Sequence, residues 1–453
     1  MVVTRESPAT ENLAYDFWVT TGDRSALLQK QMTAAFSGDV REVQTILVEP
    51  EKTFQTMDGF GYALTGGSAW LIRQKLSDRQ RTSLLKELFA PTDDGLGVSY
   101  LRISIGASDL NDHVFTYDDV ADGQTDFRLD KFSIAKDDAD VIPLLQEILA
   151  INPKIRIMGS PWSAPAWMKT NNSLKGGSLK SGCYEVFASY FVQYIQEMQK
   201  RGIPIDAITI QNEPENPKNN PSMVMTAAEQ ATFVKSFLGP AFEKSGIKTK
   251  IIVFDHNCDH PEYPISILND AAAKKYIDGS AFHLYLGEIE ALSATHAAHP
   301  DRNIYFTEQW TSPHSRFGTD LTWHVKNLMI GAPRNWSRNV LEWNLAADPQ
   351  YQPHTSNGGC DSCLGAITIG DSVTRNVSYY IVGHASKFVP PGSVRIDSSV
   401  PDGLPNVAYR TPGGKLVVLV ANEARAPKTF KVRTSKKEIT ATLPAGAVGT
   451  IRW

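Results

Sequence analysis

The chain has 453 residues, of which 42% are hydrophobic and 21% are charged, and its formal net charge is -4. This length is enough for two domains with a large core, and the slightly acidic balance excludes the basic surface typical of nucleic-acid-binding proteins. No apolar run approaches the roughly 18 residues that a membrane-spanning helix needs, so we expect none. The first 22 residues lack the apolar core of a signal peptide, but this says little about location if a leader has been removed.

Eight short apolar runs recur between residues 58 and 346, and each is followed by a stretch with helical periodicity. Strands that alternate with helices form parallel β-α-β units, and eight such units predict a closed (β/α)8 barrel. The predicted strands occupy residues 58–65, 100–106, 154–162, 206–214, 250–257, 280–287, 303–310 and 339–346. Amphipathic helices are expected at 77–90, 141–152, 184–202 and 226–246, with a last one at 374–389.

An open, doubly wound sheet is the alternative fold for such an alternation. A sheet of that kind more often begins with a Gly-rich phosphate-binding loop, and GFGYALTGG at 59–67 does not match the GxGxxG pattern. The barrel is therefore the favoured prediction.

The predicted secondary structure changes after Pro390, where short strands follow one another without a helical period. This pattern predicts a small all-β sandwich at 392–453. Strand-like pieces at 13–21 and 43–50 indicate that the N-terminal segment, 1–57, joins the same sandwich and leaves 58–391 as the barrel.

Four cysteines are too few for a disulfide scaffold. Cys360 and Cys363 have CxxC spacing in a Gly-rich loop without a second CxxC, so a local disulfide or two free thiols is favoured over zinc. The polar run at 255–260, DHNCDH, also looks metal-like, but its spacing fits no established ligand motif and we interpret it as a loop. We expect neither a metal nor a cofactor.

Polar and aromatic side chains stand where the predicted strands end. In (β/α)8 barrels the active site lies at the carboxyl ends of the strands, so these side chains should meet on one rim. Aromatic faces stack on sugar rings while carboxylates and amides bind hydroxyl groups, and this composition therefore indicates a carbohydrate site. The residues are Arg102, Asp109, Trp162, Asn212, Glu213, Asp255, His283, Tyr285, Glu308, Trp310 and Trp343.

Glu213 follows predicted strand four and Glu308 ends predicted strand seven. Glycoside hydrolysis needs a proton donor for the leaving oxygen and a carboxylate on the other side of the anomeric carbon, and this pair could supply both. The strand would hold Glu213 rigidly, and Asn212 would bind a sugar hydroxyl beside the reacting bond. Each residue also has a structural interpretation, since Glu308 could simply pair with Arg102 and the aromatic residues could all belong to the core.

At these positions the sequence resembles glycoside hydrolase family 30, a group that contains glucosylceramidases and microbial β-1,6-glucanases. The resemblance covers nearly the whole chain. The stretches that carry it are DGFGYALTGGSA, LRISIGASDL, GSPWSAPAWMKTN, TIQNEPE, AFHLYLG, FTEQW, LEWNLA and HASKFVPPGS.

The resemblance implies a retaining enzyme with Glu213 as the acid/base and Glu308 as the nucleophile. It implies Asn212 as the ligand of the sugar 2-hydroxyl. Further residues implied to hold the terminal glucose are Asp109, Trp162 and Trp343, and those implied to orient the glutamates are Arg102, His283 and Tyr285. Asp255 is expected to support a neighbouring side chain.

The substrate expectation rests on the residues around Glu308. Gln309 and Trp310 follow it, where glucosylceramidases typically have small residues, and Trp310 could stack a sugar beyond the cleavage site. We therefore expect a β-1,6-linked glucan, with a glucosylceramidase or an exo-acting β-glucosidase as the alternative. A non-catalytic carbohydrate-binding barrel and a metal hydrolase using the 255–260 run are more distant hypotheses.

We expect a carbohydrate-degrading monomer that is secreted, periplasmic or at the cell surface, with no nucleic-acid partner. A retaining mechanism predicts that the Glu213 and Glu308 carboxyls lie about 5–5.5 Å apart. It also predicts a bell-shaped pH profile with a mildly acidic maximum, in which Glu213 titrates at higher pH than Glu308 because Arg102 keeps Glu308 charged.

Overall fold

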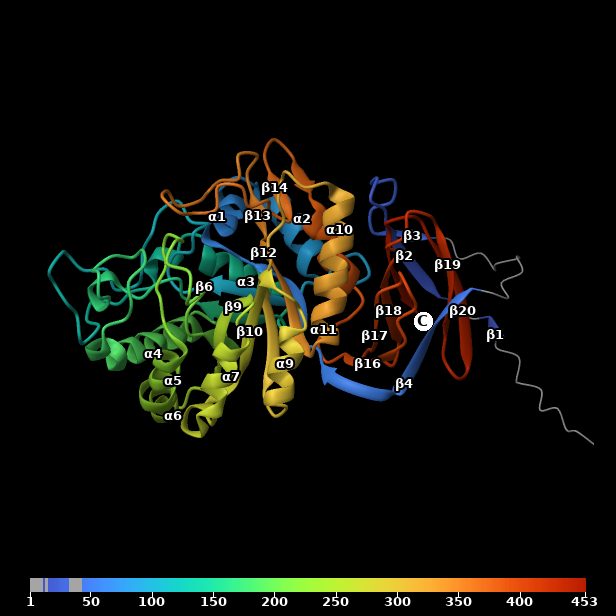
Figure 1. Ribbon diagram of the computed structural model, residues 1–453. Helices are drawn as coiled ribbons and strands as arrows, with labels where there is room; N and C mark the ends of the chain where they lie inside the picture. The colour runs from blue at the N-terminus through green and yellow to red at the C-terminus, as the bar shows by residue number, and fades with distance from the viewer. Residues whose placement is uncertain (1–10, 13–14, 32–42) are drawn as a thin grey trace, which may run out of the picture.

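The computed structural model describes residues 11–12, 15–31 and 43–453. The remaining parts of the expected N-terminal segment, at 1–10, 13–14 and 32–42, lie outside the described residues. A barrel surrounded by helices stands beside a β-rich domain (Figure 1). The predicted architecture, a (β/α)8 barrel with an all-β domain built from both ends of the chain, is confirmed.

The barrel is closed, and every neighbouring pair of its strands is parallel. Each of the eight predicted runs contributes one strand. The strands are β5 Gly59–Ala63, β6 Tyr100–Ser104, β7 Arg156–Ser160, β8 Ala207–Thr209, β9 Lys250–Cys258, β10 Ile277–Gly287, β11 Asn303–Glu308 and β12 Ser337–Asn344.

A layer of apolar side chains fills the barrel interior. Seven strands contribute one fully buried residue each, and side chains that point inward from adjacent strands of a barrel stack into such layers. The layer consists of Tyr100, Met158, Ala207, Ile252, Ala281, Tyr305 and Leu341. It forms the floor beneath the carboxyl ends of the strands.

Helices cover the outside of the barrel in the order that the sequence predicts. The principal ones are α1 Gly66–Gln74, α2 Asp78–Phe89, α3 Val141–Ile151, α4 Tyr184–Lys200, α5 Ala227–Phe233, α6 Gly239–Ser245, α7 Glu262–Asn269, α9 Ala291–Ala298, α10 Phe317–His324 and α12 Val377–Ser386. Short helices α8 Ala271–Lys274 and α11 Ala332–Arg334 complete the set. Ser77 begins α2 with a capping box that also uses Gln80, which satisfies backbone N–H groups of its first turn.

Two of the predicted helices differ in detail from those in the structure. The helix expected at 226–246 contains one π-helical segment, Val234–Leu238, between α5 and α6. The helix expected at 374–389 begins only at Val377, because Val373–Arg375 forms strand β15 of a small sheet that the sequence analysis did not predict. The other strands of that sheet are β13 Ala346–Ala347 and β14 Ile367–Ile369.

The β-rich domain combines N-terminal and C-terminal strands in the order β1-β20-β19-β4-β16-β17-β18-β21-β2-β3. Its N-terminal strands are β1 Glu11–Asn12, β2 Asp16–Thr20, β3 Gln29–Gln31 and β4 Gln44–Thr56. Its C-terminal strands are β16 Val394–Ser398, β17 Asn406–Arg410, β18 Leu416–Ala421, β19 Lys428–Arg433, β20 Lys437–Leu443 and β21 Val448–Arg452. The long strand β4 joins this domain to the barrel, since β5 starts three residues after it ends (Figure 1).

One face of this sheet packs against the barrel. Val417 and Leu419 on β18 belong to the same buried cluster as the barrel residues, and Phe60 on β5 packs edge-on against Tyr409 on β17. The opposite face encloses a separate core that includes Val418 and Val420. Within the described ranges, no helix is both long and apolar enough to cross a membrane.

Candidate active site

The site is built one step above the apolar floor of the barrel. Successive side chains of a strand alternate between its two faces, so the residue two positions after each floor residue also points inward. On six strands this position carries a polar or indole side chain. These residues are Arg102, Ser160, Thr209, His283, Thr307 and Trp343. The strand alternation therefore places a layer of hydrogen-bonding groups directly over a layer of hydrocarbon.

Arg102 connects the members of this layer and is completely buried. Its Nη1 donates to Oε2 of Glu308 at 2.6 Å, and its Nη2 donates to Asn212 Oδ1 at 2.7 Å and to Asp255 Oδ2 at 2.8 Å. Its Nε donates to Ser160 at 3.1 Å. The planar guanidinium thus fixes groups from four strand ends at once, which a single ammonium group could not do.

Asp255 is the second buried centre of contacts. Besides Arg102, it accepts hydrogen bonds from Thr209 and from Thr307, both at 2.7 Å, and its Oδ1 lies 3.1 Å from His283 Nε2. Phe254 and Asp255 both have positive φ, 73° and 67°, a conformation that costs free energy for non-glycine residues. This backbone irregularity interrupts the alternation of β9 and turns Asp255 into the layer.

Glu213 lies beyond its strand rather than on it. Strand β8 ends at Thr209, so the expectation that the strand itself holds Glu213 is wrong. Its φ is 45°, and its backbone N–H donates to the Asp255 carbonyl at 3.0 Å. Asn216 and Asn219 donate to Glu213 Oε2 at 2.7 and 3.2 Å. Contacts with the neighbouring strand end and with the following loop therefore hold this carboxylate.

Glu308 faces the same small space from the end of β11. Tyr285 donates its hydroxyl to Glu308 Oε1 at 2.9 Å, and Arg102 binds the other carboxylate oxygen. His283 stands between the two glutamates, with its Nδ1 3.3 Å from Glu213 Oε1 and 3.8 Å from Glu308 Oε1. Both carboxylates are about 6% exposed, and they face the same small space.

The histidine and its charged neighbours shift one another's pKa. Burial by itself lowers the pKa of His283, but Glu308, Asp255 and Glu213 outweigh it and raise that pKa to about 9. Burial likewise tends to raise the pKa of Asp255, yet the Arg102 charge and the His283 contact hold it well below its usual range. His283 is therefore a cation at neutral pH in the ligand-free enzyme.

The pKa of Glu213 lies below that of Glu308, which is the reverse of the predicted order. Burial raises the pKa of Glu213, but the hydrogen bond and charge of His283 prevail and bring it to about 2. The pKa of Glu308 is raised, because burial exceeds the opposing attraction of His283 and Arg102. The prediction counted the repulsion between the two carboxylates and the charge of Arg102, but it overlooked the histidine cation beside Glu213. In the ligand-free site the mobile proton therefore lies on His283, next to the Glu213 carboxylate.

A cleft of about 530 Å³ opens onto these groups. Of the predicted residues, Asp109, Glu213, Tyr285, Glu308, Trp310 and Trp343 line it. Asn212 and His283 lie buried behind this surface, as does Trp162, which stacks on Trp343 with ring centroids 5.4 Å apart. Burial, followed by the charges of Glu308 and Glu213, raises the pKa of Asp109 to about 7. All eleven predicted residues are thus brought to one end of the barrel.

Cys360 and Cys363 form a disulfide in the wall of this cleft, which decides between the two alternatives that the sequence left open. Cys363 packs in the buried cluster that contains Trp162 and Trp343. The backbone of Cys360 hydrogen-bonds the Asp109 carboxylate. The bridge therefore lies in a loop that contacts both the loop after Glu213, where Asn220 donates to the Ser356 carbonyl, and the loop after Glu308, where Thr311 pairs with Leu364.

The sequence analysis gave no function to several residues that the structure places here. Thr209 and Thr307 bind Asp255, while Asn216 and Asn219 bind Glu213. The alternation of the two strands could have revealed the threonines, whereas nothing local points to the asparagines. The residues of the polar run at 255–260 have different surroundings. Asp255 and His256 are buried at the site, whereas His260 pairs with Glu215 near the surface at 2.9 Å.

A closed (β/α)8 barrel with carboxylates, amides and stacked indoles around one cleft at the carboxyl ends of its strands defines a carbohydrate-cleaving hydrolase. The description "Glycosyl hydrolase family 30 TIM-barrel domain" matches residues 57–389, and "Glycosyl hydrolase family 30 beta sandwich domain" matches residues 392–451. The chain belongs to glycosyl hydrolase family 30 and is a retaining glycoside hydrolase.

Known proteins that resemble the chain carry two kinds of name. An endo-1,6-beta-D-glucanase of Aspergillus fumigatus is 34% identical over 395 residues, which cover 81% of this chain and 78% of the relative. A lysosomal acid glucosylceramidase of Mus musculus is 30% identical over 415 residues, covering 84% and 77% of the two chains. The solved structure of the endo-beta1,6-glucanase BT3312 superposes with a TM-score of 0.90 at 33% identity, covering 97% of this chain and 99% of that one.

Proposed function

We propose that this enzyme cleaves β-1,6-linked glucan by double displacement, with Glu213 as the acid/base and Glu308 as the nucleophile. The observation that carries the proposal is the convergence of the two buried carboxylates on His283 Nδ1, at 3.3 and 3.8 Å, inside the cleft. Two carboxylates so close to one small space suit the short separation of retaining enzymes.

In the first step Glu308 attacks the anomeric carbon while a proton passes from Glu213 to the leaving oxygen, which gives a covalent glycosyl-enzyme. The ligand-free site stores the mobile proton on His283, beside Glu213 Oε1. When a sugar covers the cleft, His283 transfers this proton to Glu213, and the protonated Glu213 can then act as the acid. Arg102 and Tyr285 donate to Glu308 throughout, which aligns its attack and stabilises the carboxylate again when the ester breaks.

In the second step Glu213, now ionised, removes a proton from the water that attacks the glycosyl-enzyme. The amides of Asn216 and Asn219 stabilise this ionised form through Glu213 Oε2. Glu213 Oε1 faces His283 and is the oxygen that exchanges the proton. The two carboxylate oxygens of Glu213 therefore serve different purposes.

The glucose at the cleavage site would bind between the indoles and the polar wall. Trp343 offers a ring face, Asp109 offers a carboxylate, and Asn212 keeps its amide nitrogen for the 2-hydroxyl because Arg102 occupies its oxygen. Among the described residues, no partner lies within hydrogen-bonding distance of the buried Trp162 Nε1. A sugar hydroxyl that enters the site would satisfy this donor.

The linkage preference rests on Trp310, which lines the cleft two residues after Glu308. Its indole provides a stacking surface for the sugar beyond the cleavage point, and a flexible 1,6-linkage allows two glucose units to lie against different walls. The names of the endo-1,6-glucanase relatives point the same way.

One observation favours a glucosylceramidase instead. Leu286 lines the cleft and is 59% exposed, which leaves an apolar surface available to an apolar aglycone. A lipid aglycone would contact Leu286 where a second sugar would contact Trp310.

The same proposal includes the setting in which the enzyme works. A disulfide between Cys360 and Cys363 persists in an oxidising compartment, so we place the enzyme outside the cytoplasm, in secreted, periplasmic or cell-surface form. The net charge of -4 suits an enzyme that acts on a neutral glucan without a nucleic-acid partner, and we propose that it acts as a monomer.

A substrate panel tests the linkage directly. Gentiobiose, longer β-1,6-glucan, laminarin, an aryl β-glucoside and glucosylceramide are compared by kcat/KM. We expect β-1,6-glucan to give the highest value and laminarin little turnover. A higher kcat/KM for glucosylceramide would contradict the proposed substrate, and Trp310→Ala compared with Leu286→Ala would then show which wall binds the aglycone.

Two variants test the assignment of the glutamates. Glu308→Gln should lose activity even on substrates with good leaving groups, because no glycosyl-enzyme can form. Glu213→Gln should still react with an activated aryl glucoside, accumulate the glycosyl-enzyme, and release β-glucosyl azide when azide is added. Azide rescue to a β-product in Glu308→Gln alone would reverse the two assignments.

A further inference from the structure

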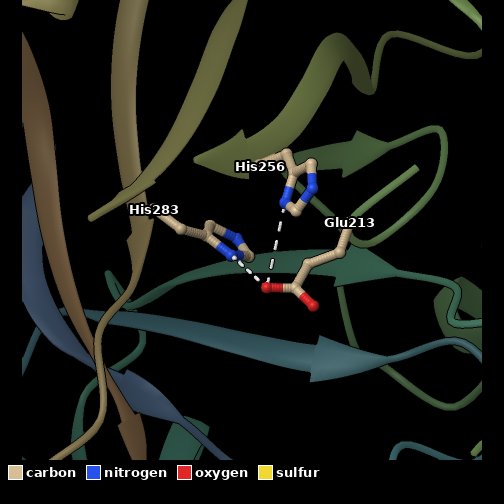
Figure 2. Close-up of side chains that lie close together, drawn as sticks. All are labelled: Glu213, His256 and His283. Carbon is tan, nitrogen blue, oxygen red and sulfur yellow. Dashed lines mark hydrogen bonds and ion pairs between the residues drawn. The ribbon is translucent and has the colours of Figure 1, made fainter. Parts of the chain in front are cut away.

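Three buried side chains beside the cleft point their ligand atoms at one another. Figure 2 shows His256 and His283 directed at the same oxygen of Glu213. His283 Nδ1 lies 3.3 Å and His256 Nδ1 lies 3.9 Å from Glu213 Oε1, and all three atoms lie within 4.8 Å of one another. The mechanism above uses Glu213 and His283 but gives His256 no task.

His256 is the unexplained member of this group. It is only 8% exposed, and among the described residues its Nδ1 has no hydrogen-bond partner. A buried imidazole nitrogen without a partner costs free energy, so its persistence beside a carboxylate calls for a ligand.

The spacing suits a small transition-metal ion. A tetrahedral ion with bonds of about 2.0–2.1 Å separates its ligand atoms by roughly 3.3 Å. The pair formed by His283 and Glu213 already has this separation, whereas His256 would need to move about half an ångström closer to Glu213 and also approach His283, from which its ligand atom is at most 4.8 Å away. Asp255 holds the other nitrogen of His283 at 3.1 Å, which is the carboxylate–histidine arrangement that orients metal-binding imidazoles.

The charges around the group also favour a cation. Four buried carboxylates, of Asp109, Glu213, Asp255 and Glu308, surround the site. Among the described residues, Arg102 is the one buried arginine or lysine that pairs with any of them, and His283 is the second cation. Glu213 and His256 both line the cleft, so an ion could reach them from solvent. The second histidine and the open cleft distinguish this group from an ordinary buried ion pair.

We propose that Glu213, His256 and His283 form an inhibitory site for one divalent transition-metal ion of the Zn²⁺ class, with Cu²⁺ bound more tightly. The ion occupies the Glu213 oxygen that must exchange a proton with the glycosidic oxygen, so metal and substrate exclude one another. Metal binding rests on the geometry, and it requires the ion to displace the Nδ1 proton of His283, which is released to the buffer. The inhibition rests on the proposed function of Glu213.

Calorimetric titration of the chelator-treated enzyme with ZnCl₂, in a buffer that does not bind zinc, measures binding without any turnover. We expect one ion per chain. His256→Gln should weaken binding by more than about tenfold, because it removes one of three ligands. The matched control is His260→Gln, two residues beyond the end of β9. Its side chain is half exposed and paired with Glu215, and this variant should bind zinc as the wild type does.

Three outcomes would overturn the metal site: no stoichiometric zinc binding, unchanged binding in His256→Gln, or an equal loss in His260→Gln. Near-ultraviolet circular dichroism of each variant shows whether the fold is intact, and Cu²⁺ electron paramagnetic resonance of the folded variants reports nitrogen ligation independently.

Kinetics test the inhibition separately. Zn²⁺ should raise KM and leave kcat unchanged on an aryl β-glucoside, and excess chelator should restore the original KM. Zinc binding that depends on His256 but leaves KM unchanged would overturn the inhibition. Failure to cleave β-1,6-glucan with normal zinc binding would instead count against the proposed substrate, so the two failures can be told apart.

Discussion

Arg102 shows how much of the site depends on one residue. It is completely buried, it donates to four different acceptors, and its guanidinium carbon lies 4.8 Å from the centre of the Trp162 ring. A planar group with fixed donor directions can satisfy this arrangement, whereas a lysine offers three donors from one point. Arg102 therefore fixes the geometry of the site as well as balancing its charge.

Replacing Arg102 with lysine should impair both stability and catalysis. At least one buried acceptor loses its donor, which costs about 1–3 kcal/mol of unfolding free energy. Misalignment of Glu308 should lower kcat by roughly a hundredfold, while KM changes less. Urea unfolding and steady-state kinetics on an aryl β-glucoside measure the two effects. Wild-type kcat in a destabilised Arg102→Lys protein would show that Arg102 acts only in folding.

His283 sets the protonation of the glutamates, and its replacement should move the pH profile. In the wild type its pKa of about 9 keeps a proton in the site well above neutral pH. In His283→Gln that proton must reside on Glu213 itself, whose pKa rises from about 2 when the cation is removed but stays below 9. The alkaline limb of kcat/KM should therefore shift to lower pH. An unshifted alkaline limb would contradict this account of the proton.

At the scale of elements, the strands fix the positions of the side chains inside the barrel, and the loops after the strands form the walls of the cleft. Two successive inward positions on each strand, such as Tyr100 and Arg102 on β6, give an apolar floor and a polar layer. The loop that carries the disulfide lines the same cleft as Asn219 and Trp310. Gly359 in that loop approaches so closely that an added Cβ would lie 2.9 Å from the Asp109 carbonyl oxygen and 2.3 Å from the Thr355 carbonyl oxygen.

Removing the disulfide should therefore affect binding more than folding. The bridge closes a very short loop, with a sequence separation of 3, so its loss costs at most about 2 kcal/mol in chain entropy. The Asp109 wall and the Trp343 cluster lose their support, so we expect KM for a β-glucoside to rise several-fold in the Cys360→Ser/Cys363→Ser protein, with a smaller change in kcat.

Parallel melting curves check that the double variant is folded. Reduction of the wild type with dithiothreitol should raise KM to a similar degree, while the buried free thiols Cys183 and Cys258 remain in both proteins as an internal control. An unchanged KM in the folded double variant would show that the loop keeps its shape without the bridge.

At the scale of the whole molecule, the β-rich domain and the barrel share a buried contact surface. His384 on α12 lies in it, completely buried, with its Nδ1 2.9 Å from Thr450 on β21 and its Nε2 2.8 Å from Thr20 on β2. Both nitrogens are thereby satisfied in the neutral ring. Burial lowers the pKa of His384 to about 3.

This histidine should make the folded protein sensitive to acid. Above about pH 6.5 the ring is neutral in both states, and below that value only the unfolded chain binds the proton, so unfolding free energy is lost as the pH falls toward 3. The loss approaches roughly 1.4 kcal/mol per pH unit. His384→Gln should be less stable at pH 7 but should show a shallower dependence between pH 6.5 and 4 in urea unfolding.

The matched control is His113→Gln, whose side chain is 66% exposed, and its slope should equal that of the wild type. If unfolding free energy falls equally steeply with pH in His384→Gln and in the wild type, other groups govern the acid sensitivity of the domain contact.

The sequence by itself determined the barrel, the sandwich and the residues gathered at the rim. It could do so because hydrophobic periodicity and strand order are local properties, and because parallel strands in a barrel bring their carboxyl ends together. The eight strands, the all-β C-terminal segment and the clustering of Arg102, Glu213 and Glu308 follow from these rules.

Only the tertiary structure decided which charges meet. The low pKa of Glu213 depends on His283, which is 70 residues away, and on a backbone turn with positive φ that no pattern announces. The convergence of His256 on the same oxygen depends on the turn at Phe254 and Asp255 that interrupts β9. Electrostatic energy changes over a few ångströms, so it depends on side-chain positions that a one-dimensional pattern does not contain.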